Sequence, residues 1–232
     1  MIRQYPLDLR WPPHQRLDAF WPGPNANALR AVADIATGHG ASAYLHGAHG
    51  TGKTHLLIAA CRRAGEARLA ARYVTLAELG SARGELIAGL RAEGLLALDD
   101  VQAVAGDASA ERALFDLYNR AHAAHACLLL AATAAPTELG MHLPDLVSRL
   151  STPTRYALHP MDDADRRTML RMLAERLGLR LDDDVLDWWF ARQPRDAASM
   201  VALLQRLDRA SLAAQRRITI PFLRELLRDA VV

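Results

Sequence analysis

The chain has 232 residues, 51% of them hydrophobic and 23% charged, so it can bury a core and is too apolar to be mainly disordered. No apolar run approaches the ~18–20 residues of a membrane span, and no unit recurs at the ~20–50-residue period of a repeat protein. A net charge of +2 and 6% aromatic residues disfavour a nucleic-acid binder that works by electrostatics or base stacking.

The predicted elements alternate between helix and strand up to residue 158. Residues 1–13 are rich in proline and are expected to form a flexible leader. A helix at 25–37 is followed by strands at 42–47, 72–76, 95–100, 127–133 and 154–158. Helices are expected at 55–65, within 77–93, at 108–123 and at 143–150. This alternation predicts an α/β fold with a parallel sheet of five strands.

After Pro160 no further strand is expected. Four amphipathic stretches, at 162–178, 182–193, 195–215 and 220–230, predict a small all-α lid domain. The expected domains are therefore a leader at 1–13, a nucleotide-binding α/β domain at 14–159 and a helical lid at 160–232.

The two cysteines, Cys61 and Cys127, form no CxxC pair and indicate reduced thiols. The N-terminus has no apolar stretch of the kind found in a secretory signal. Together these features predict a cytoplasmic protein with no membrane partner.

A phosphate-binding loop is the strongest motif. Residues 47–54 read GAHGTGKT, which is the G-x-x-x-x-G-K-T pattern, and they stand between a predicted strand and a predicted helix. Lys53 is the one lysine among 28 basic residues, and it stands where a compact ammonium is needed. It is expected to reach the β and γ phosphates, while the Thr54 hydroxyl binds Mg²⁺. The predicted nucleotide-binding residues are Gly47, Gly50, Thr51, Gly52, Lys53, Thr54, His55 and Asp99.

A second motif lies 45 residues beyond Thr54. The run LLALDD at 95–100 is a buried-strand pattern that ends in two acids. Asp99 is expected to hold Mg²⁺ together with Thr54, and Asp100 is expected to orient the attacking water. No metal site is expected from His46, His49 and His55, because ligands spread over a strand, a loop and a helix do not converge.

These motifs and their order resemble the DnaA-related family of AAA+ ATPases. The segments that carry the resemblance are the P-loop, LLALDD, FWPGPN at 20–25, FDLYNR at 115–120, LPDLVSRL at 143–150, LDRAS at 207–211 and ITIPF at 218–222. No helicase-loading domain is expected before the ATPase segment, and no DNA-reading domain is expected after the lid. It is therefore more similar to the regulatory branch of the family than to the initiators.

The resemblance implies negative control of replication initiation. Members of that branch bind ADP or ATP with Mg²⁺ and meet the DnaA initiator on the sliding clamp, the β subunit of DNA polymerase III, so that they reach DNA indirectly. Gln4, Leu7 and Leu9 resemble a clamp-binding motif. In such a motif the glutamine amide forms a hydrogen bond at the rim of a pocket on the clamp, and the leucines fill that apolar pocket. Arg149 corresponds to the family's arginine finger, which acts in trans on ATP bound to DnaA. Self-association remains open.

Two positions depart from the family. The residue aligned with the second-sensor arginine of the lid is Ala198, although Arg195 lies about one turn earlier, and the first-sensor position holds Thr133. Both departures put the protein's own hydrolysis in question. The alternatives are a self-contained ATPase that serves as a helicase loader or transposase helper, a truncated initiator paralogue that binds DNA, and a clamp-bound scaffold that works without nucleotide.

Overall fold

The structure is a computed structural model that describes residues 15–214 and 217–228. It divides the chain into two compact units, residues 1–159 and 160–232. The clamp motif predicted at Gln4, Leu7 and Leu9 lies outside the described residues.

The first unit is built on a sheet of five parallel strands in the order β2-β3-β4-β1-β5. The strands are β1 (Ala43–His46), β2 (Ala71–Thr75), β3 (Leu95–Asp99), β4 (Cys127–Ala132) and β5 (Thr154–Ala157). Every residue of β3 is buried, as the near-continuous apolar sequence of a central parallel strand requires. The predicted α/β fold with five parallel strands is confirmed.

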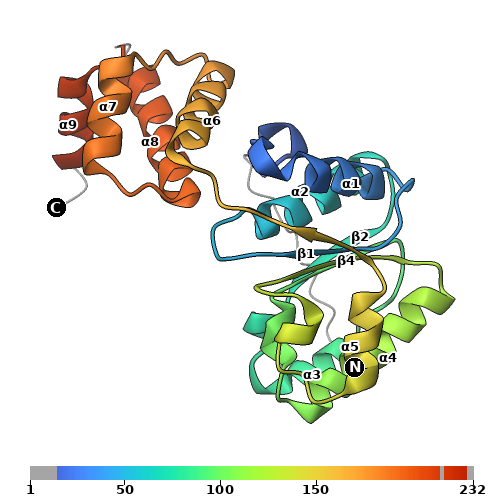
Figure 1. Ribbon diagram of the computed structural model, residues 1–232. Coiled ribbons are helices and arrows are strands. Elements are labelled where there is room, and N and C mark those ends of the chain that lie inside the picture. Colours follow the sequence, from blue (N-terminus) through green and yellow to red (C-terminus); the bar gives the residue numbers. More distant parts are fainter. Residues whose placement is uncertain (1–14, 215–216, 229–232) are drawn as a thin grey trace. The chain divides into compact units, whose positions relative to one another are not determined.

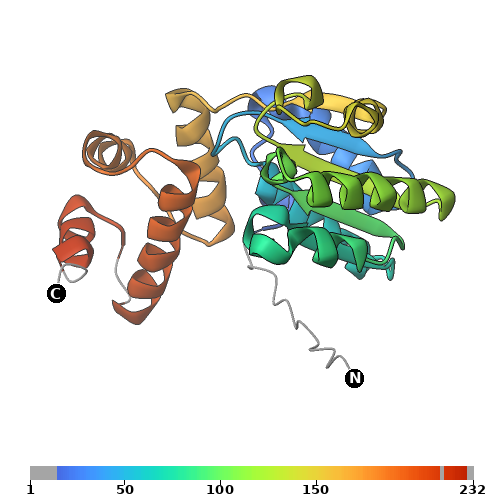
Figure 2. The same ribbon diagram turned by 90° about the horizontal axis from the view of Figure 1, so that it is seen from below.

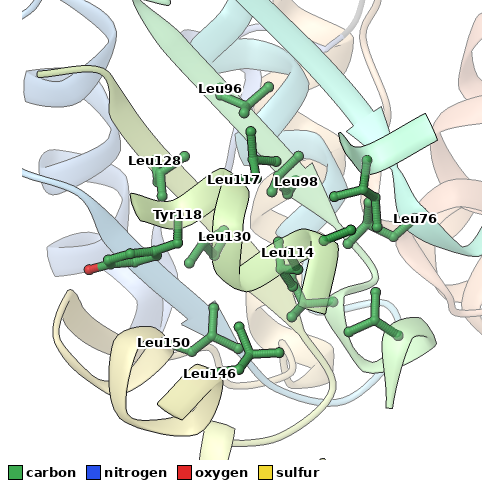
Figure 3. Close-up of a cluster of buried hydrophobic side chains, with 14 of the residues drawn as sticks. Leu76, Leu96, Leu98, Leu114, Leu117, Tyr118, Leu128, Leu130, Leu146 and Leu150 are labelled. Atoms are coloured by element: carbon green, nitrogen blue, oxygen red, sulfur yellow. The ribbon is translucent and has the colours of Figure 1, made fainter. Parts of the chain in front are cut away.

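Helices cover both faces of this sheet (Figures 1 and 2). On one face lie α1 (Ala26–Ala36) and α2 (Lys53–Glu66), and on the other lie α3 (Arg83–Ala88), α4 (Ala108–Ala123) and α5 (Pro144–Ser151). Side chains alternate along each strand, so that Leu96 and Leu98 join the core under α4 while Leu95 and Ala97 join the core under α2. Figure 3 shows the first of these cores.

Short 3-10 segments join the regular elements: η1 (Leu17–Ala19), η2 (Gly23–Asn25), η3 (Leu76–Ala82), η4 (Val101–Val104) and η5 (Pro136–Glu138). The weakly patterned stretch 77–93 contains most of η3 and all of α3. Its position depends on α4, because the guanidinium of Arg120 donates to the carbonyl oxygens of Ala88 (3.0 Å) and Leu90 (3.3 Å) at the end of α3. A Cβ at Gly84 would lie 2.3 Å from Ser109 Oγ and 3.2 Å from the Ser109 carbonyl carbon, so a larger residue there would force Ser109 to shift.

The second unit consists, in its described part, of the helices α6 (Asp163–Arg176), α7 (Asp183–Arg192), α8 (Ala197–Ala214) and α9 (Ile220–Arg228). Asp162 caps α6 by accepting a hydrogen bond from the Asp165 N–H at 2.8 Å, and Gly178 follows the helix with a left-handed φ of 71°. The core of the unit is apolar and includes Met169, Leu186, Trp189, Leu204 and Leu223. The predicted helical lid is confirmed. No helix within residues 15–214 and 217–228 is long and apolar enough to cross a membrane.

Candidate nucleotide site

The loop between β1 and α2 lies at the edge of the sheet where the strands have their carboxyl ends, and α2 begins there. The N-cap of α2 is Gly52, with a left-handed φ of 96° and no side chain to occupy the helix terminus. A Cβ at Gly52 would lie 2.6 Å from the Phe20 ring, and one at Gly47 would lie 2.3 Å from the Leu158 carbonyl oxygen. Gly47 and Gly52 are therefore required by close packing as well as by backbone conformation, whereas at Gly50 only the left-handed φ of 78° favours glycine. A helix terminus with free N–H groups favours an anion.

Lys53 lies inside this loop and is buried. Its ammonium donates to the carbonyl oxygens of Gly47 (2.7 Å) and Ala48 (2.9 Å), so the side chain curls back along the loop. Burial lowers the pKa of Lys53, and the carboxylates of Asp99 and Asp100 oppose that shift. The loop thus combines a fixed positive charge with the terminus of α2, an arrangement suited to phosphate.

Asp99, at the end of β3, is 1% exposed and accepts three hydrogen bonds. Its Oδ2 accepts from the Thr54 hydroxyl at 2.6 Å and from the Tyr73 hydroxyl at 3.0 Å, and its Oδ1 accepts from the Asp100 N–H at 2.9 Å. The structure therefore brings the P-loop hydroxyl and the strand-end carboxylate together, although 45 residues separate them. Adjacent hydroxyl and carboxylate oxygens are the ligands that Mg²⁺ prefers, so these residues fit the ion implied by the motif.

Asp100 adopts a left-handed φ of 55° and turns into a separate polar network. Its Oδ2 accepts from the Thr75 hydroxyl at 3.2 Å, and its Oδ1 accepts from the Gln102 amide at 2.9 Å. The Gln102 carbonyl in turn accepts from the Thr133 N–H at 3.2 Å. This network joins the ends of β2, β3 and β4, and it binds both oxygens of the carboxylate predicted to orient water.

The segment before α1 lies against the P-loop. The Phe20 ring meets the His55 imidazole edge-on at 5.5 Å between centroids, and His55 Nε2 lies 2.9 Å from the Arg16 carbonyl oxygen. Asn25, buried to 4% exposure, bonds twice to the backbone of His159: its amide donates to the carbonyl oxygen at 2.9 Å and its oxygen accepts from the N–H at 2.8 Å. The FWPGPN segment is thus held beside the loop and bound to the backbone two residues after β5.

Arg149 does not belong to this cluster. It lies on α5 and is exposed, and no hydrogen bond or ion pair links its guanidinium to another described residue. Its guanidinium is therefore accessible to solvent and to a partner.

The two residues considered for the second-sensor role, Ala198 and Arg195, differ in their surroundings. Ala198 is exposed near the start of α8. Arg195 is bound within its own unit, where its guanidinium donates to the Phe190 carbonyl oxygen (3.1 Å) and to Asp163 (2.7 Å). These contacts tie the start of α6 and the last turn of α7 to the residues just before α8, so in this structure Arg195 contributes to the packing of its own unit.

Family models match both units of the chain. The bacterial DnaA ATPase domain matches residues 13–154, and a model described as Hda, lid domain, matches residues 163–227. The chain is an Hda-like member of the DnaA-related AAA+ family. The resemblance inferred from the sequence motifs is therefore confirmed.

Solved structures share the fold of this AAA+ protein. Domain III of the Thermotoga maritima replication initiation protein DnaA superposes with a TM-score of 0.71 at 21% identity, covering 94% of this chain and 98% of that one. AMPPCP-bound DnaA from Aquifex aeolicus gives 0.70 at 22% identity, over 85% of this chain and 66% of that one. The Thermotoga maritima RuvB branch migration motor gives 0.61 at 15% identity, over 88% and 67%.

Two residues of the AAA+ site had not been predicted. Tyr73 approaches Asp99 from β2, and Gln102 bridges Asp100 to the end of β4. Both contacts depend on β2, β3 and β4 being neighbours in the sheet, an order that the sequence does not state. The one indication in the sequence was the polar residue Gln102, two positions after Asp100.

Proposed function

We propose that this protein is a negative regulator of replication initiation that promotes hydrolysis of ATP bound to DnaA. The observation that carries the proposal is the pairing, in one chain, of a DnaA-type ATPase domain with an Hda lid domain. The residue geometry of the P-loop and the exposed Arg149 support it.

In this proposal the P-loop holds ADP or ATP. Lys53 and the N–H groups at the start of α2 bind the phosphates, and Thr54 with Asp99 holds Mg²⁺. When bound, Mg²⁺ neutralises phosphate charge. Phe20 and Asn25, which fasten the segment beside the loop, border the side on which an adenine base would lie.

The protein's own hydrolysis is expected to be slow. Asp100, the candidate for orienting water, has both oxygens bound to Thr75 and Gln102. Neither Thr133 nor Ala198 offers a charged side chain at the sensor positions. The bound nucleotide then serves mainly to stabilise the conformation of the protein that acts on DnaA.

Arg149 supplies the catalytic contribution in trans. Its guanidinium is planar and permanently charged, and it can donate two parallel hydrogen bonds to phosphate oxygens as negative charge develops on them. An arginine supplied in this way is worth about 10³–10⁵ in rate. DnaA would thereby become ADP-bound and inactive.

Docking on the DNA-loaded sliding clamp through Gln4, Leu7 and Leu9 limits this activity to replicating DNA. Tethering two proteins to one clamp raises their effective concentration to about millimolar. The site of action is then the cytoplasm, at the nucleoid, with contact to DNA made through the clamp.

The test follows labelled ATP pre-bound to DnaA, with loaded clamp present. The proposal predicts clamp-dependent conversion to ADP by the wild-type protein, loss of conversion with Arg149→Ala, and wild-type conversion with Arg30→Ala. Arg30 is the matched control because it is also exposed but lies on α1, on the opposite face of the sheet from α5. Absence of stimulation by wild type with clamp and nucleotide bound would reject the proposal. Rapid ATP turnover by the protein alone would instead favour the hypothesis of a self-contained ATPase that serves as a helicase loader or transposase helper.

A further inference from the structure

Glu111 is a charged residue buried in an apolar core. It lies on α4 and is 0% exposed, and Ala110 and Leu114 of the same helix belong to the core, part of which Figure 3 shows. Within residues 15–214 and 217–228, no lysine or arginine forms an ion pair with it. A buried carboxylate without compensating contacts is strongly unfavourable, so its actual contacts explain why it is there.

Within the described part of the chain, the hydrogen-bond donors to the Glu111 carboxylate are all backbone N–H groups. The N–H of His142 lies 3.0 Å from Oε1 and 2.9 Å from Oε2, the N–H of Leu143 lies 2.7 Å from Oε2, and the N–H of Gly106 lies 2.9 Å from Oε1. Burial raises the pKa of Glu111, but these N–H groups and the nearby His142 outweigh burial and bring the pKa below its usual range. The residue is therefore charged and holds two loops.

The loop that contains His142 and Leu143 leads directly into α5. Leu143 is the N-cap of that helix and provides no side-chain cap, and Pro144 at the first helical position has no N–H. Glu111 supplies the negative charge at this helix terminus from a different helix. The start of α5 is thus fixed by a residue 32 positions away in sequence.

The rest of α5 is held by a narrow apolar contact. The helix has eight residues, and of these Leu146 and Leu150 are buried, facing Leu114, Tyr118 and Leu130 in the core (Figure 3). A helix this short is marginal by itself, so sliding or tilting of α5 is opposed by these two leucines and by the contacts at its start. Because Arg149 adjoins Leu150 on the exposed side, such movement would carry the guanidinium with it.

We propose that Glu111 is a positioning residue for the arginine finger: its buried carboxylate binds the N–H groups of His142 and Leu143 and fixes the place at which α5 presents Arg149. This inference rests on the proposed function of Arg149. Misplacing a catalytic group by about 1 Å can lower a rate by about 10²-fold. The contacts of Glu111, although far from the reacting phosphate, therefore control how strongly the protein stimulates hydrolysis of DnaA-bound ATP.

The test compares Glu111→Gln with Glu85→Gln, which makes the same chemical change at an exposed glutamate of α3. The first measurement needs no DnaA. In Glu111→Gln the amides of α5 are expected to exchange with solvent at least tenfold faster, while exchange in α2 and binding of fluorescent ADP stay at wild-type values. Unchanged exchange in α5 would overturn the inference.

The second measurement is clamp-dependent hydrolysis of DnaA-bound ATP. Glu111→Gln is expected to lower the maximal stimulated rate about tenfold at saturating protein, with the half-saturating concentration unchanged, and to cause no further loss in an Arg149→Ala background. A rise in the half-saturating concentration with an unchanged maximal rate would overturn the positioning role. If the wild type itself gives no stimulation, the proposed function fails, and the exchange data alone decide whether Glu111 fixes α5. If Glu111→Gln does not fold, Glu111→Asp, which withdraws the carboxylate by one methylene, is subjected to both measurements.

Discussion

The two units of the chain use charge in opposite ways. In the first unit Lys53, Asp99 and Glu111 are buried, and each makes hydrogen bonds to the backbone or to hydroxyl groups. In the described part of the second unit every buried residue is apolar, and the charged residues pair near the surface, as Arg167 does with Asp187 at 2.7 Å. Charge thus fixes the geometry of the nucleotide-binding unit, whereas the second unit depends for its stability on apolar packing.

The largest effect is expected from removing a core residue of the second unit. Trp189 is 1% exposed, and Trp189→Ala should lower the free energy of unfolding by about 3–5 kcal/mol through lost burial and an unfilled cavity. The neighbouring Trp188 is only half-buried, so Trp188→Ala should cost less than half as much. Urea unfolding followed by circular dichroism checks both, and equal losses would contradict a cost set by the burial of the side chain.

Removing the buried carboxylate should destabilise the first unit. Glu111→Ala leaves the N–H groups of Gly106, His142 and Leu143 without their acceptor, at a cost of about 3 kcal/mol in unfolding free energy. Glu85→Ala, at an exposed position, serves as the control. Hydrogen exchange should place the loss in residues 104–151, and a loss spread evenly over both units would contradict this assignment.

Acid should weaken the first unit through the same residue. Because the folded pKa of Glu111 lies below its usual value, the carboxylate contributes stability that is present above the unfolded pKa of about 4.3 and is lost as pH falls through the lower folded pKa. The wild-type urea midpoint should therefore fall more steeply below about pH 4.3 than that of Glu111→Gln. Parallel profiles for the two proteins would mean that Glu111 does not titrate with unfolding.

Tyr73 offers a test of the polar geometry at Asp99. Tyr73→Phe removes one hydrogen bond to Oδ2, and loss of such an outer contact typically weakens metal binding about 10-fold or more. Mg²⁺ should therefore bind the ADP-loaded variant about 10-fold more weakly, while ADP binding without Mg²⁺ should be unchanged. Titration calorimetry separates the two, and an equal loss in both would point to general damage to the site.

The smallest effect is expected from a surface ion pair of the second unit. Asp187→Asn removes the carboxylate that Arg167 contacts, and an exposed pair of this kind is worth less than about 1 kcal/mol. The difference from wild type should vanish in about 1 M salt, where screening is nearly complete. A larger effect that persists in salt would show that charge also fixes the geometry of this unit.

The sequence predicted those parts of the molecule that depend on neighbouring residues. The P-loop, the strand ending in Asp99 and the apolar periods of the helices are local patterns, and the structure has the corresponding elements at these places. It did not predict the contacts of Tyr73, Gln102 or Glu111, because each joins elements whose adjacency is set by strand order and helix packing. In sequence, Glu111 is simply a charged residue in the first turn of a helix, and nothing there separates it from an exposed one. The trans role of Arg149 also depends on a partner and stays a prediction.

The double hydrogen bond between Asn25 and His159 has a mechanical consequence. His159 is the last residue of the first unit, and Pro160, with its fixed φ, is the first residue of the second. By binding both the carbonyl oxygen and the N–H of His159, Asn25 holds the main chain of the first unit up to its last residue. Replacing Asn25 would release both of these backbone groups.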